Sequence, residues 1–283
     1  MKSDEVRAVV RSSRQIDGWF LPDAAQLFGL LDEAQRRAGI TGDLFEIGVH
    51  HGRSTVLLAH MAQESERVKV CDVFGEQEAN PSRSGQGDRA IFERNMAAFA
   101  PPGREVDVFE TSSDQLTPEE IASPCRFFHV DGGHLVEEAL GDLRLGASVL
   151  HDRGVLVVDD PFKPEWPGVT EAIVRFLDEH ADLVPVVLGF NKLVICPRAA
   201  RTTYDEALAD PWSYVDRRVW EVKELPIAGS ATRIFMIPNY RQIGGLDRWA
   251  ARAVWLRIAL RDRAARMMQT MRREARDGPC PPA

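Results

Sequence analysis

The sequence predicts an α/β protein with a doubly wound, Rossmann-like sheet, and two observations carry this prediction. Short apolar segments typical of buried strands alternate with helical segments along the chain. Beyond them, the apolar runs Leu183 to Leu188 and Lys192 to Cys196 flank the short turn Gly189-Phe190-Asn191, which favours an antiparallel hairpin. The pattern predicts seven strands ending in that hairpin, over residues 44–47, 68–73, 106–109, 127–130, 155–158, 183–188 and 192–196.

Helices are predicted between these strands and before the first of them. The segment Pro22 to Arg37 repeats apolar residues at helical spacing, including Leu27, Phe28 and Leu31. We expect this helix to pack against the sheet edge or to cover the ligand site. The other predicted helices span residues 53–61, 88–99, 135–150 and 169–180.

Composition restricts the class of protein. A chain of 283 residues with 44% hydrophobic side chains can bury one sizeable core and carry appendages. No apolar run approaches the roughly 20 residues that span a bilayer, and the first residues lack an apolar signal segment, so we expect a cytoplasmic protein. The cysteines form no Cys-x-x-Cys pair, which favours buried thiols over disulfides or zinc ligands: Cys71, Cys125, Cys196 and Cys280.

A glycine turn follows the first predicted strand and predicts a ligand site. Gly48 and Gly52 allow a sharp bend and a close approach of backbone to ligand, and the helix from Arg53 to Met61 directs its N-terminus at that ligand. We include Ser54, at the start of this helix, among the expected cofactor contacts. The turn lacks the further glycines of a dinucleotide fingerprint, which disfavours a pyrophosphate. Glu46, just before the turn, suits a cationic group such as the α-amino group of S-adenosylmethionine.

Acids and hydroxyls after the next two strands extend the predicted cofactor site. Asp72 ends a strand and follows Glu46 at close to the spacing at which an acid meets ribose hydroxyls, although a turn or cap role is the alternative. Ser113 and Asp114 follow the strand after that and either bind the adenine or begin a helix.

Three further acids end two strands. Asp131 closes one apolar run, and Asp159 with Asp160 closes another. If these strands are neighbours, the carboxylates converge as hard oxygen donors suited to Mg²⁺ or another divalent cation. Because successive strand residues point to opposite faces, Asp159 and Asp160 can both reach a cation only if the strand ends between them. Structural capping is the alternative interpretation. Beside them, His134 is a candidate base, because a histidine side chain suits proton removal at neutral pH.

From about Gly18 to Pro197, the chain resembles S-adenosylmethionine-dependent class I O-methyltransferases, in particular the metal-dependent macrolide-sugar and rhamnosyl O-methyltransferases. The matching pieces, in order, are Asp17-Gly-Trp-Phe20, Glu46-Ile-Gly-Val-His-His-Gly-Arg-Ser54, Val-Asp131-Gly-Gly-His134, Gly-Val-Leu-Val-Val-Asp159-Asp160 and Trp166-Pro-Gly-Val169.

This resemblance implies that Asp131, Asp159 and Asp160 hold magnesium, that Asp131 also borders the cofactor, and that His134 is the general base. The implied reaction is Mg²⁺-assisted methyl transfer to a sugar hydroxyl of a glycan, glycolipid or glycosylated natural product. A small-phenol or catechol-type O-methyltransferase shares every motif and remains an alternative, although catechol-type enzymes often have Asp-Asn where this chain has Asp159-Asp160. A non-catalytic cofactor-binding partner in a biosynthetic complex is the third interpretation.

The segments outside this core carry two further expectations. The loop from Gly75 to Asp88 is polar and rich in turn formers, so it is either a lid or an ordinary surface loop. From Leu246 to Asp277, nine arginines against four acids flank an apolar stripe, which predicts a basic amphipathic helix.

This helix packs on its own domain or on a second subunit, or it contacts an anionic surface at the membrane periphery. We expect a homo-oligomer with a small-molecule or glycan acceptor. We expect no nucleic-acid partner, because the chain outside the basic helix is acidic and no base-reading motif occurs.

The expected regions are a helical cover (1–40), a methyltransferase domain (41–198), an aromatic-rich substrate or interface module (199–245) and the basic helix with its tail (246–283).

Overall fold

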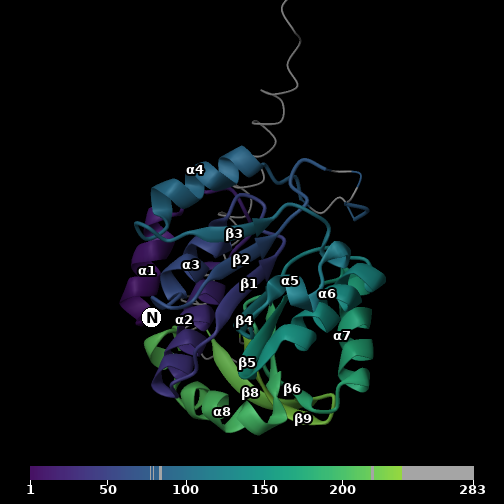
Figure 1. The fold of residues 1–283 in the computed structure, drawn as a ribbon. Coiled ribbons are helices and arrows are strands. Elements are labelled where there is room, and N and C mark those ends of the chain that lie inside the picture. Colours follow the sequence, from purple (N-terminus) through teal and green to yellow (C-terminus); the bar gives the residue numbers. More distant parts are fainter. Residues whose placement is uncertain (77, 79, 83–84, 218–219, 238–283) are drawn as a thin grey trace, which may run out of the picture. The chain divides into compact units, whose positions relative to one another are not determined.

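The computed structural model describes residues 1–76, 78, 80–82, 85–217 and 220–237 (Figure 1). Its contacts divide the chain into two units, one of residues 1–215 and 222–235 and one of residues 216–221 and 236–283. All the elements and sites described below lie in the first unit, apart from single residues at the ends of two strands. The predicted basic helix lies outside the described residues.

The first unit is built on one mixed sheet. In the described residues this sheet has nine strands, in the order β3-β2-β1-β4-β5-β7-β6-β9-β8. The strands from β3 to β5 run parallel, and β7 lies antiparallel between β5 and β6. Their bounds are β1 Asp43–Ile47, β2 Val68–Cys71, β3 Val106–Phe109, β4 Cys125–Val130, β5 Leu150–Asp159, β6 Leu183–Gly189, β7 Lys192–Pro197, β8 Glu221–Ile227 and β9 Ser230–Met236.

The predicted fold class is confirmed, with two more strands than the seven expected. Strands β8 and β9 come from the segment in which the sequence showed only an aromatic-rich module. They flank a turn at Ala228 and Gly229, both with positive φ (45° and 72°), which is typical of tight hairpin turns. Strand β9 pairs parallel to β6 through Val187 and Arg233, so this part of the module extends the sheet.

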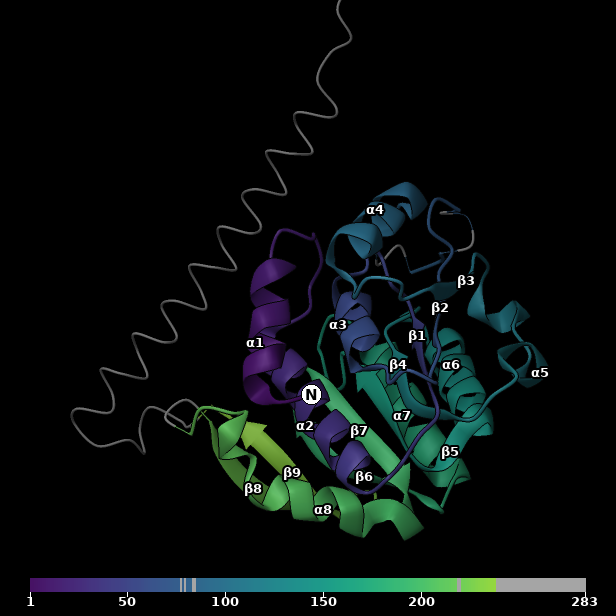
Figure 2. The ribbon, with the colours of Figure 1, turned by 60° about the vertical axis from the view of Figure 1, so that its left-hand side comes forward.

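Helices cover both faces of the sheet (Figure 2). On one face, α2 contacts α1, α3 and α8, and α3 contacts α4; on the other, α6 contacts α5 and α7. The helices α2 and α3 have the predicted bounds: α2 carries a regular apolar stripe, and α3 begins directly after the turn residue Gly52. The bounds are α1 Ser3–Ser12, α2 Pro22–Arg37, α3 Arg53–Met61, α4 Arg89–Phe99, α5 Pro118–Ile121, α6 Val136–Val149, α7 Pro167–Glu179 and α8 Arg201–Ala209.

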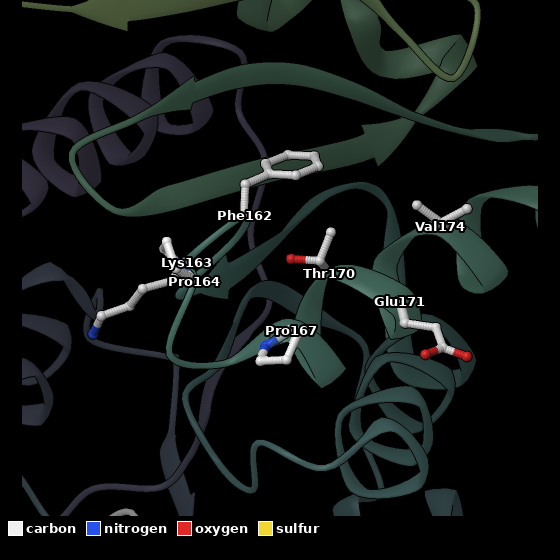
Figure 3. Close-up of a pocket in the computed structure, with 7 residues that line it drawn as sticks. All are labelled: Phe162, Lys163, Pro164, Pro167, Thr170, Glu171 and Val174. Carbon is white, nitrogen blue, oxygen red and sulfur yellow. The ribbon is translucent and has the colours of Figure 1, made fainter.

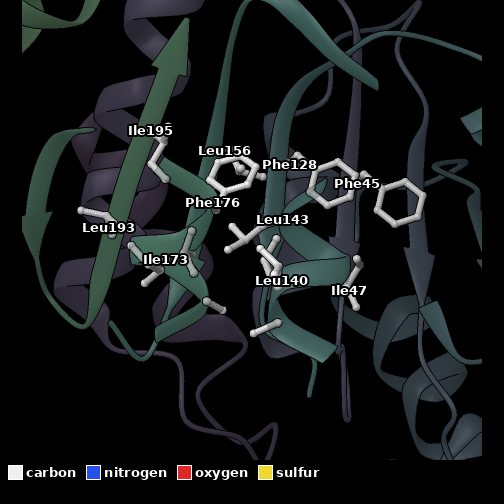
Figure 4. Packing of buried hydrophobic residues seen from close by; sticks show 14 of the residues in the cluster. Phe45, Ile47, Phe128, Leu140, Leu143, Leu156, Ile173, Phe176, Leu193 and Ile195 are labelled. Carbon is white, nitrogen blue, oxygen red and sulfur yellow. The ribbon is translucent and has the colours of Figure 1, made fainter. Parts of the chain in front are cut away.

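An apolar cluster fills the space between the sheet and the helices α6 and α7 (Figure 4). The rings of Phe45 on β1 and Phe128 on β4 stack with centroids 4.8 Å apart, and Leu143 and Phe176 reach the sheet from the two helices. Each such fully buried side chain contributes about 1.5–3 kcal/mol through removal from water. The core therefore fixes the strands whose ends form the site.

A buried charge network holds the N-terminal helices on the face of the sheet opposite α6 and α7. Arg126 on β4 is fully buried, and its guanidinium contacts Glu66 at 2.7 and 2.9 Å, Asp32 at 2.9 Å and Gln35 at 2.6 Å. Asp32 and Gln35 lie on α2, and the N-terminal ammonium also pairs with Asp32. Because a buried charge is tolerated only when it is paired, this network holds α2 against the sheet.

The cysteines and the membrane prediction can be compared directly with the structure. Cys71, Cys125 and Cys196 are buried free thiols, as predicted, and Cys280 lies outside the described residues. In the described part of the chain, no helix combines the length and the apolar character needed to cross a membrane.

Gly48 marks the closest approach of two strand ends. Its φ is +79°, and a Cβ atom there would lie 1.9 Å from the carbonyl oxygen of Asp131. The Asp131 backbone N–H donates to the Ile47 carbonyl at 2.9 Å, so the turn after β1 lies directly against the end of β4. Only glycine fits this position without moving one of the strand ends.

We expect Gly48→Ala to lower the free energy of unfolding by at least about 2 kcal/mol more than the control Gly39→Ala does. Gly39 has a similar φ of +65°, but a Cβ atom there would meet nothing within 4 Å, so the control isolates backbone strain from steric overlap. Urea unfolding of both variants measures the difference. Equal losses would show that the two strand ends separate without cost.

Candidate functional site

The candidate site lies at the carboxyl ends of the parallel strands. In open α/β sheets this edge binds ligands where the strand order reverses, and here it reverses between β1 and β4. The turn between β6 and β7 reaches the same edge, because β7 runs antiparallel to β5 and places Lys192 opposite Asp159. The carboxyl ends of β1, β2, β4 and β5 and the start of β7 thus contribute residues to the candidate site.

The glycine turn has the geometry of a ligand cradle. Gly52, with φ +86°, precedes the first residue of α3, and His50 is also left-handed at φ 51°. The first amides of α3 have no partners within the helix and can donate to a ligand. Gly48, Gly52 and Ser54 all lie on this turn and the first helical turn, as the sequence predicted, and their contact with a cofactor remains a prediction.

Asp72 holds the glycine turn in place. Its Oδ2 accepts hydrogen bonds from the Val49 and His50 amides at 2.7 and 2.8 Å, and its Oδ1 accepts from the Phe74 amide at 2.6 Å. The turn-stabilising role that sequence left as the alternative is therefore present. Oδ2 already accepts two hydrogen bonds, whereas Oδ1 accepts one and keeps a second lone pair, so the predicted ribose contact remains open through Oδ1.

Glu46 has internal hydrogen-bond partners, and its predicted contact with a cofactor amino group stays a prediction. It is fully buried, accepts a hydrogen bond from the Thr55 hydroxyl and lies 2.8 Å from Nδ1 of His129. Glu46 and His129 are register partners on β1 and β4, which brings the two side chains together inside the protein. The carboxylate that sequence assigned to a cofactor amino group is thus engaged with internal partners.

Ser113 and Asp114 begin a short 3-10 helix after β3, at Ser113–Gln115, in agreement with the structural alternative. Ser113 hydrogen-bonds to Asp142 of α6, and burial raises the pKa of Asp142 to about 7, with the nearby charges of Glu138 and Asp114 adding to the effect. The predicted adenine contact of Ser113 and Asp114 stays a prediction. The hydrogen bond between Ser113 and Asp142 links the loop after β3 to α6.

The three predicted acids converge. Strand β5 ends at Asp159, and Asp160 adopts a left-handed φ of 55°, so the strand does end between the two residues. The Asn191 amide nitrogen donates to both of them, at 2.8 Å to Asp159 and 2.5 Å to Asp160. Asp131, directly after the end of β4, shares a hydrogen bond with Asp159.

Two lysines neutralise this cluster. Lys192 Nζ lies 2.6 Å from Asp159 Oδ1, and Lys163 Nζ lies 3.0 Å from Asp160 Oδ1. Burial acts to raise the pKa of Asp159, but the Lys192 charge and the hydrogen bond from Asp131 outweigh burial and lower that pKa. Burial, together with the charge of Asp159, raises the pKa of Asp131 well above its usual value. Asp131 therefore donates the shared proton to an ionised Asp159.

His134 and Asp160 form a carboxylate–imidazole pair. Nε2 of His134 lies 3.1 Å from Asp160 Oδ2, and the ring lies 4.2 Å from the ring of Trp166. Burial opposes ionisation of Asp160, but hydrogen bonds from His134, Asn191 and Lys163 lower its pKa, so Asp160 is a pure acceptor. Nε2 consequently carries the proton, and Nδ1, which has no hydrogen-bond partner, keeps its lone pair.

The donors around the acids do not fit a bound divalent cation. The cation-facing oxygens of Asp159 and Asp160 already accept from ammonium, amide and imidazole groups, and Asp131 is bonded to Asp159. Within the described residues, no group of three His, Cys, Asp or Glu side chains is arranged to hold a metal ion. The expected magnesium site therefore has converging acids but an ammonium group among them.

The comparisons with known proteins identify the core of the chain. Residues 45–161 match a family model described as a methyltransferase domain. These residues are a methyltransferase domain of the S-adenosylmethionine-dependent class. No curated protein sequence matches the chain.

Among solved structures, that of NovP agrees with the fold of the methyltransferase domain, and two others are also similar to the chain. The O-methyltransferase NovP is 16% identical, with a TM-score of 0.53 over 67% of this chain and 87% of NovP. An O-methyltransferase from Bacillus cereus in complex with SAH is 16% identical, with a TM-score of 0.47 over 69% of this chain and 90% of that one. CalS11, a TDP-rhamnose 3'-O-methyltransferase, is 15% identical, with a TM-score of 0.46 over 68% and 93%.

Residues before the methyltransferase domain lie across its site. The ring of Trp19 lies 5.3 Å from that of His50, and Phe20 lies under the Lys192 ammonium, which is 5.6 Å from the ring centroid. The Gly18 carbonyl accepts from Arg53 at 2.6 Å. This short segment therefore reaches from the glycine turn to the acidic cluster.

The loop predicted as a lid also lies beside the methyltransferase site. A Cβ atom on Gly87 would be 3.2 Å from Asp72 Oδ1 and 3.4 Å from the His50 carbonyl, so this end of the loop contacts the glycine turn. Its position suits a lid, and closure remains a prediction.

A cavity of about 490 Å³ lies beyond the acidic cluster, between the segment after β5 and helix α7 (Figure 3). Its lining is mostly apolar, and it adjoins the cluster through Lys163, which contacts Asp160. The lining residues are Phe162, Lys163, Pro164, Pro167, Thr170, Glu171 and Val174.

Sequence reasoning missed the basic and amide partners of the acids. Asn191 and Lys192 were interpreted only as parts of a hairpin, and Lys163 was given no role. A signal was present: Lys192 begins an otherwise apolar strand, where a charged side chain has to find a buried partner. His129, inside the apolar run of β4, carried the same signal.

Asp142 makes the stability of the methyltransferase domain depend on pH. The folded protein keeps this carboxyl protonated up to about pH 7, whereas the ordinary pKa is 3.8, so stability falls as pH rises through that window. We expect Asp142→Asn to gain about 2 to 3 kcal/mol of stability relative to the wild type between pH 5 and pH 8.

Urea unfolding at several pH values measures this gain, and Asp178→Asn, which removes an exposed carboxylate from α7, is the control. A pH-independent difference between Asp142→Asn and wild type would show that Asp142 is ionised throughout.

Proposed function

We propose that this protein transfers the methyl group of S-adenosylmethionine to a sugar hydroxyl of a glycan, glycolipid or glycosylated natural product, with His134 as general base. The observation that carries the proposal is the His134–Asp160 pair, whose Nδ1 lone pair is unused, at the carboxyl edge of a methyltransferase domain.

The cofactor site is proposed to be the glycine turn and the strand ends next to it. Gly48 and Gly52 let the turn lie tightly against Asp131 and Phe92, where a Cβ atom would not fit, and the first amides of α3 lack partners within the helix. Asp72 holds the turn and is proposed to accept from the ribose hydroxyls. Ser54, Ser113 and Asp114 complete the proposed set. When bound, S-adenosylmethionine supplies an electrophilic methyl group on sulfur.

His134 removes the acceptor proton in this proposal. Asp160 accepts the Nε2 proton, which fixes the imidazole tautomer and directs the Nδ1 lone pair away from the carboxylate. As the new C–O bond forms and the C–S bond breaks, the hydroxyl proton passes to Nδ1. The negative charge of Asp160 stabilises the resulting imidazolium.

The acceptor is proposed to lie against aromatic surfaces near His134. Trp166 contacts the His134 ring, and Trp19 is 63% exposed beside the glycine turn. Flat aromatic faces pack well on the C–H surfaces of sugars. The neighbour NovP is an O-methyltransferase, which agrees with oxygen as the acceptor atom. The 490 Å³ cavity beside Lys163 offers apolar space for the part of the acceptor that is not methylated.

We expect His134→Ala to lower turnover at least about 100-fold and to leave S-adenosylmethionine affinity unchanged, because His134 is assigned to the acceptor proton. Calorimetric titration gives the affinity, with NAD as a control ligand. Radiolabelled methyl transfer to sugar nucleotides, glycosides and catechol gives turnover and the acceptor class.

His180→Ala is the matched histidine control, because His180 caps α7 and packs on Phe176. Full turnover in His134→Ala would remove the base assignment, and failure of the wild type to bind S-adenosylmethionine would remove the proposed function.

We expect Asp72→Ala to weaken S-adenosylmethionine binding about 10- to 100-fold, because the variant loses the hydrogen bonds that hold the Val49 and His50 amides. Asp107→Ala, which removes a partly exposed carboxylate from the neighbouring strand, should leave the affinity unchanged. Calorimetry measures both. Unaltered affinity in Asp72→Ala would place the ribose elsewhere.

A further inference from the structure

The acidic cluster contains a cationic side chain at the position where a metal ion was expected. Lys192 is 2% exposed, and its ammonium lies 2.6 Å from Asp159 Oδ1. Burial opposes ionisation of Lys192, but the acidic cluster, with the charge of Asp159 foremost, outweighs burial and raises the pKa of Lys192. A divalent cation held by these carboxylates would lie next to the ammonium, and the two positive charges would repel each other strongly in a site with little water.

The fold gives Lys192 little freedom to leave. It is the first residue of β7, which lies between β5 and β6, and it stands directly opposite Asp159 in the register. The ring of Phe20 lies 5.6 Å from the ammonium on another side. An exit would leave Asp159 buried without its cationic partner and would require the segment containing Phe20 to move.

The remaining carboxylate positions are also occupied. Asn191 donates to Asp159 and Asp160, and Lys163 contacts both oxygens of Asp160, at 3.0 and 3.3 Å. Mg²⁺ requires near-octahedral oxygen ligands at about 2.0–2.1 Å. Binding of Mg²⁺ would displace an ammonium group and the Asn191 amide from Asp159 and Asp160.

We propose that the Lys192 ammonium takes the place of a divalent cation in this site, so that the acids position His134 without bound metal. Lys192 is a positioning residue in this proposal: its charge holds Asp159 ionised in place, Asn191 links Asp159 to Asp160, and Asp160 holds His134. The catalytic consequence rests on the proposed methyl transfer, whereas the charge replacement concerns the cluster alone.

The chain offers a matched control for the loss of a buried lysine. Lys69 pairs with Asp43 at 2.7 Å, and the two side chains are 6% and 9% exposed. Lys69 also donates to the Ile121 carbonyl, on the opposite edge of the strands from the site. Lys69→Met therefore removes the same kind of ion pair without touching the acidic cluster.

The experiment measures Mn²⁺ binding by the full chain, by calorimetry and by the electron paramagnetic resonance signal of free Mn²⁺. We expect the wild type to bind no stoichiometric Mn²⁺ at micromolar concentration and to keep its turnover in a chelator. Lys192→Met, which keeps length and removes charge, should bind Mn²⁺ at least about 10-fold more tightly than wild type, because Asp159 then lacks its cation beside the oxygen atoms of Asp131 and Asp160. Lys69→Met should show no gain.

Two results would overturn the proposal. One is micromolar, stoichiometric Mn²⁺ binding by the wild type that Asp160→Asn abolishes. The other is a folded Lys192→Met variant with no gain in Mn²⁺ affinity. If Lys192→Met does not fold, the wild-type titration still decides. S-adenosylmethionine binding by the same samples separates the two proposals, because its absence removes the methyl-transfer function and leaves the Mn²⁺ result on the cluster unaffected.

Discussion

The buried ion pair between Asp159 and Lys192 is the interaction on which the site depends. Asp159 ends a parallel strand, and Lys192 begins the neighbouring strand, so their contact exists only because β7 runs antiparallel to β5. A parallel β7 would place its first residue at the opposite edge of the sheet. The final hairpin of the fold therefore does more than complete the sheet: it brings a positive charge and the Asn191 amide to the edge where acids collect.

The segment that covers this ion pair lies near the N-terminus of the chain. Phe20 lies against the Lys192 ammonium, and the helices on either side of it are held by contacts far from the site. The buried Arg126 network fixes α2 to β4. Because an ion pair strengthens as water is excluded, the anchoring of the N-terminal helices bears directly on the electrostatics of the acids.

Sequence predicted what is periodic and missed what depends on register. The bounds of α2 and α3 and the hairpin follow from patterns within single segments, whereas the convergence of Asp131 with Asp159 and Asp160 was predicted only on the condition that β4 and β5 are neighbours. The partner of Glu46 does not: its contact with His129 arises from the pairing of β1 with β4, and strand order cannot be read from one chain. The sequence motif predicted a ligand contact for Glu46, whereas in the structure its carboxylate contacts Thr55 and His129.

Burial and hydrogen-bond partners distinguish two of the histidines near this edge, His129 and His134. In the part of the chain that the structure describes, His129 Nε2 and His134 Nδ1 are both buried without hydrogen-bond partners. His129 is fully buried against the rings of Phe28 and Phe20, and burial followed by the Lys192 charge lowers its pKa, which makes it a poor proton acceptor. His134 lies on a loop, its side chain is 11% exposed, its carboxylate partner is ionised and its ring adjoins Trp166, so its ring, unlike that of His129, reaches the surface with its tautomer held.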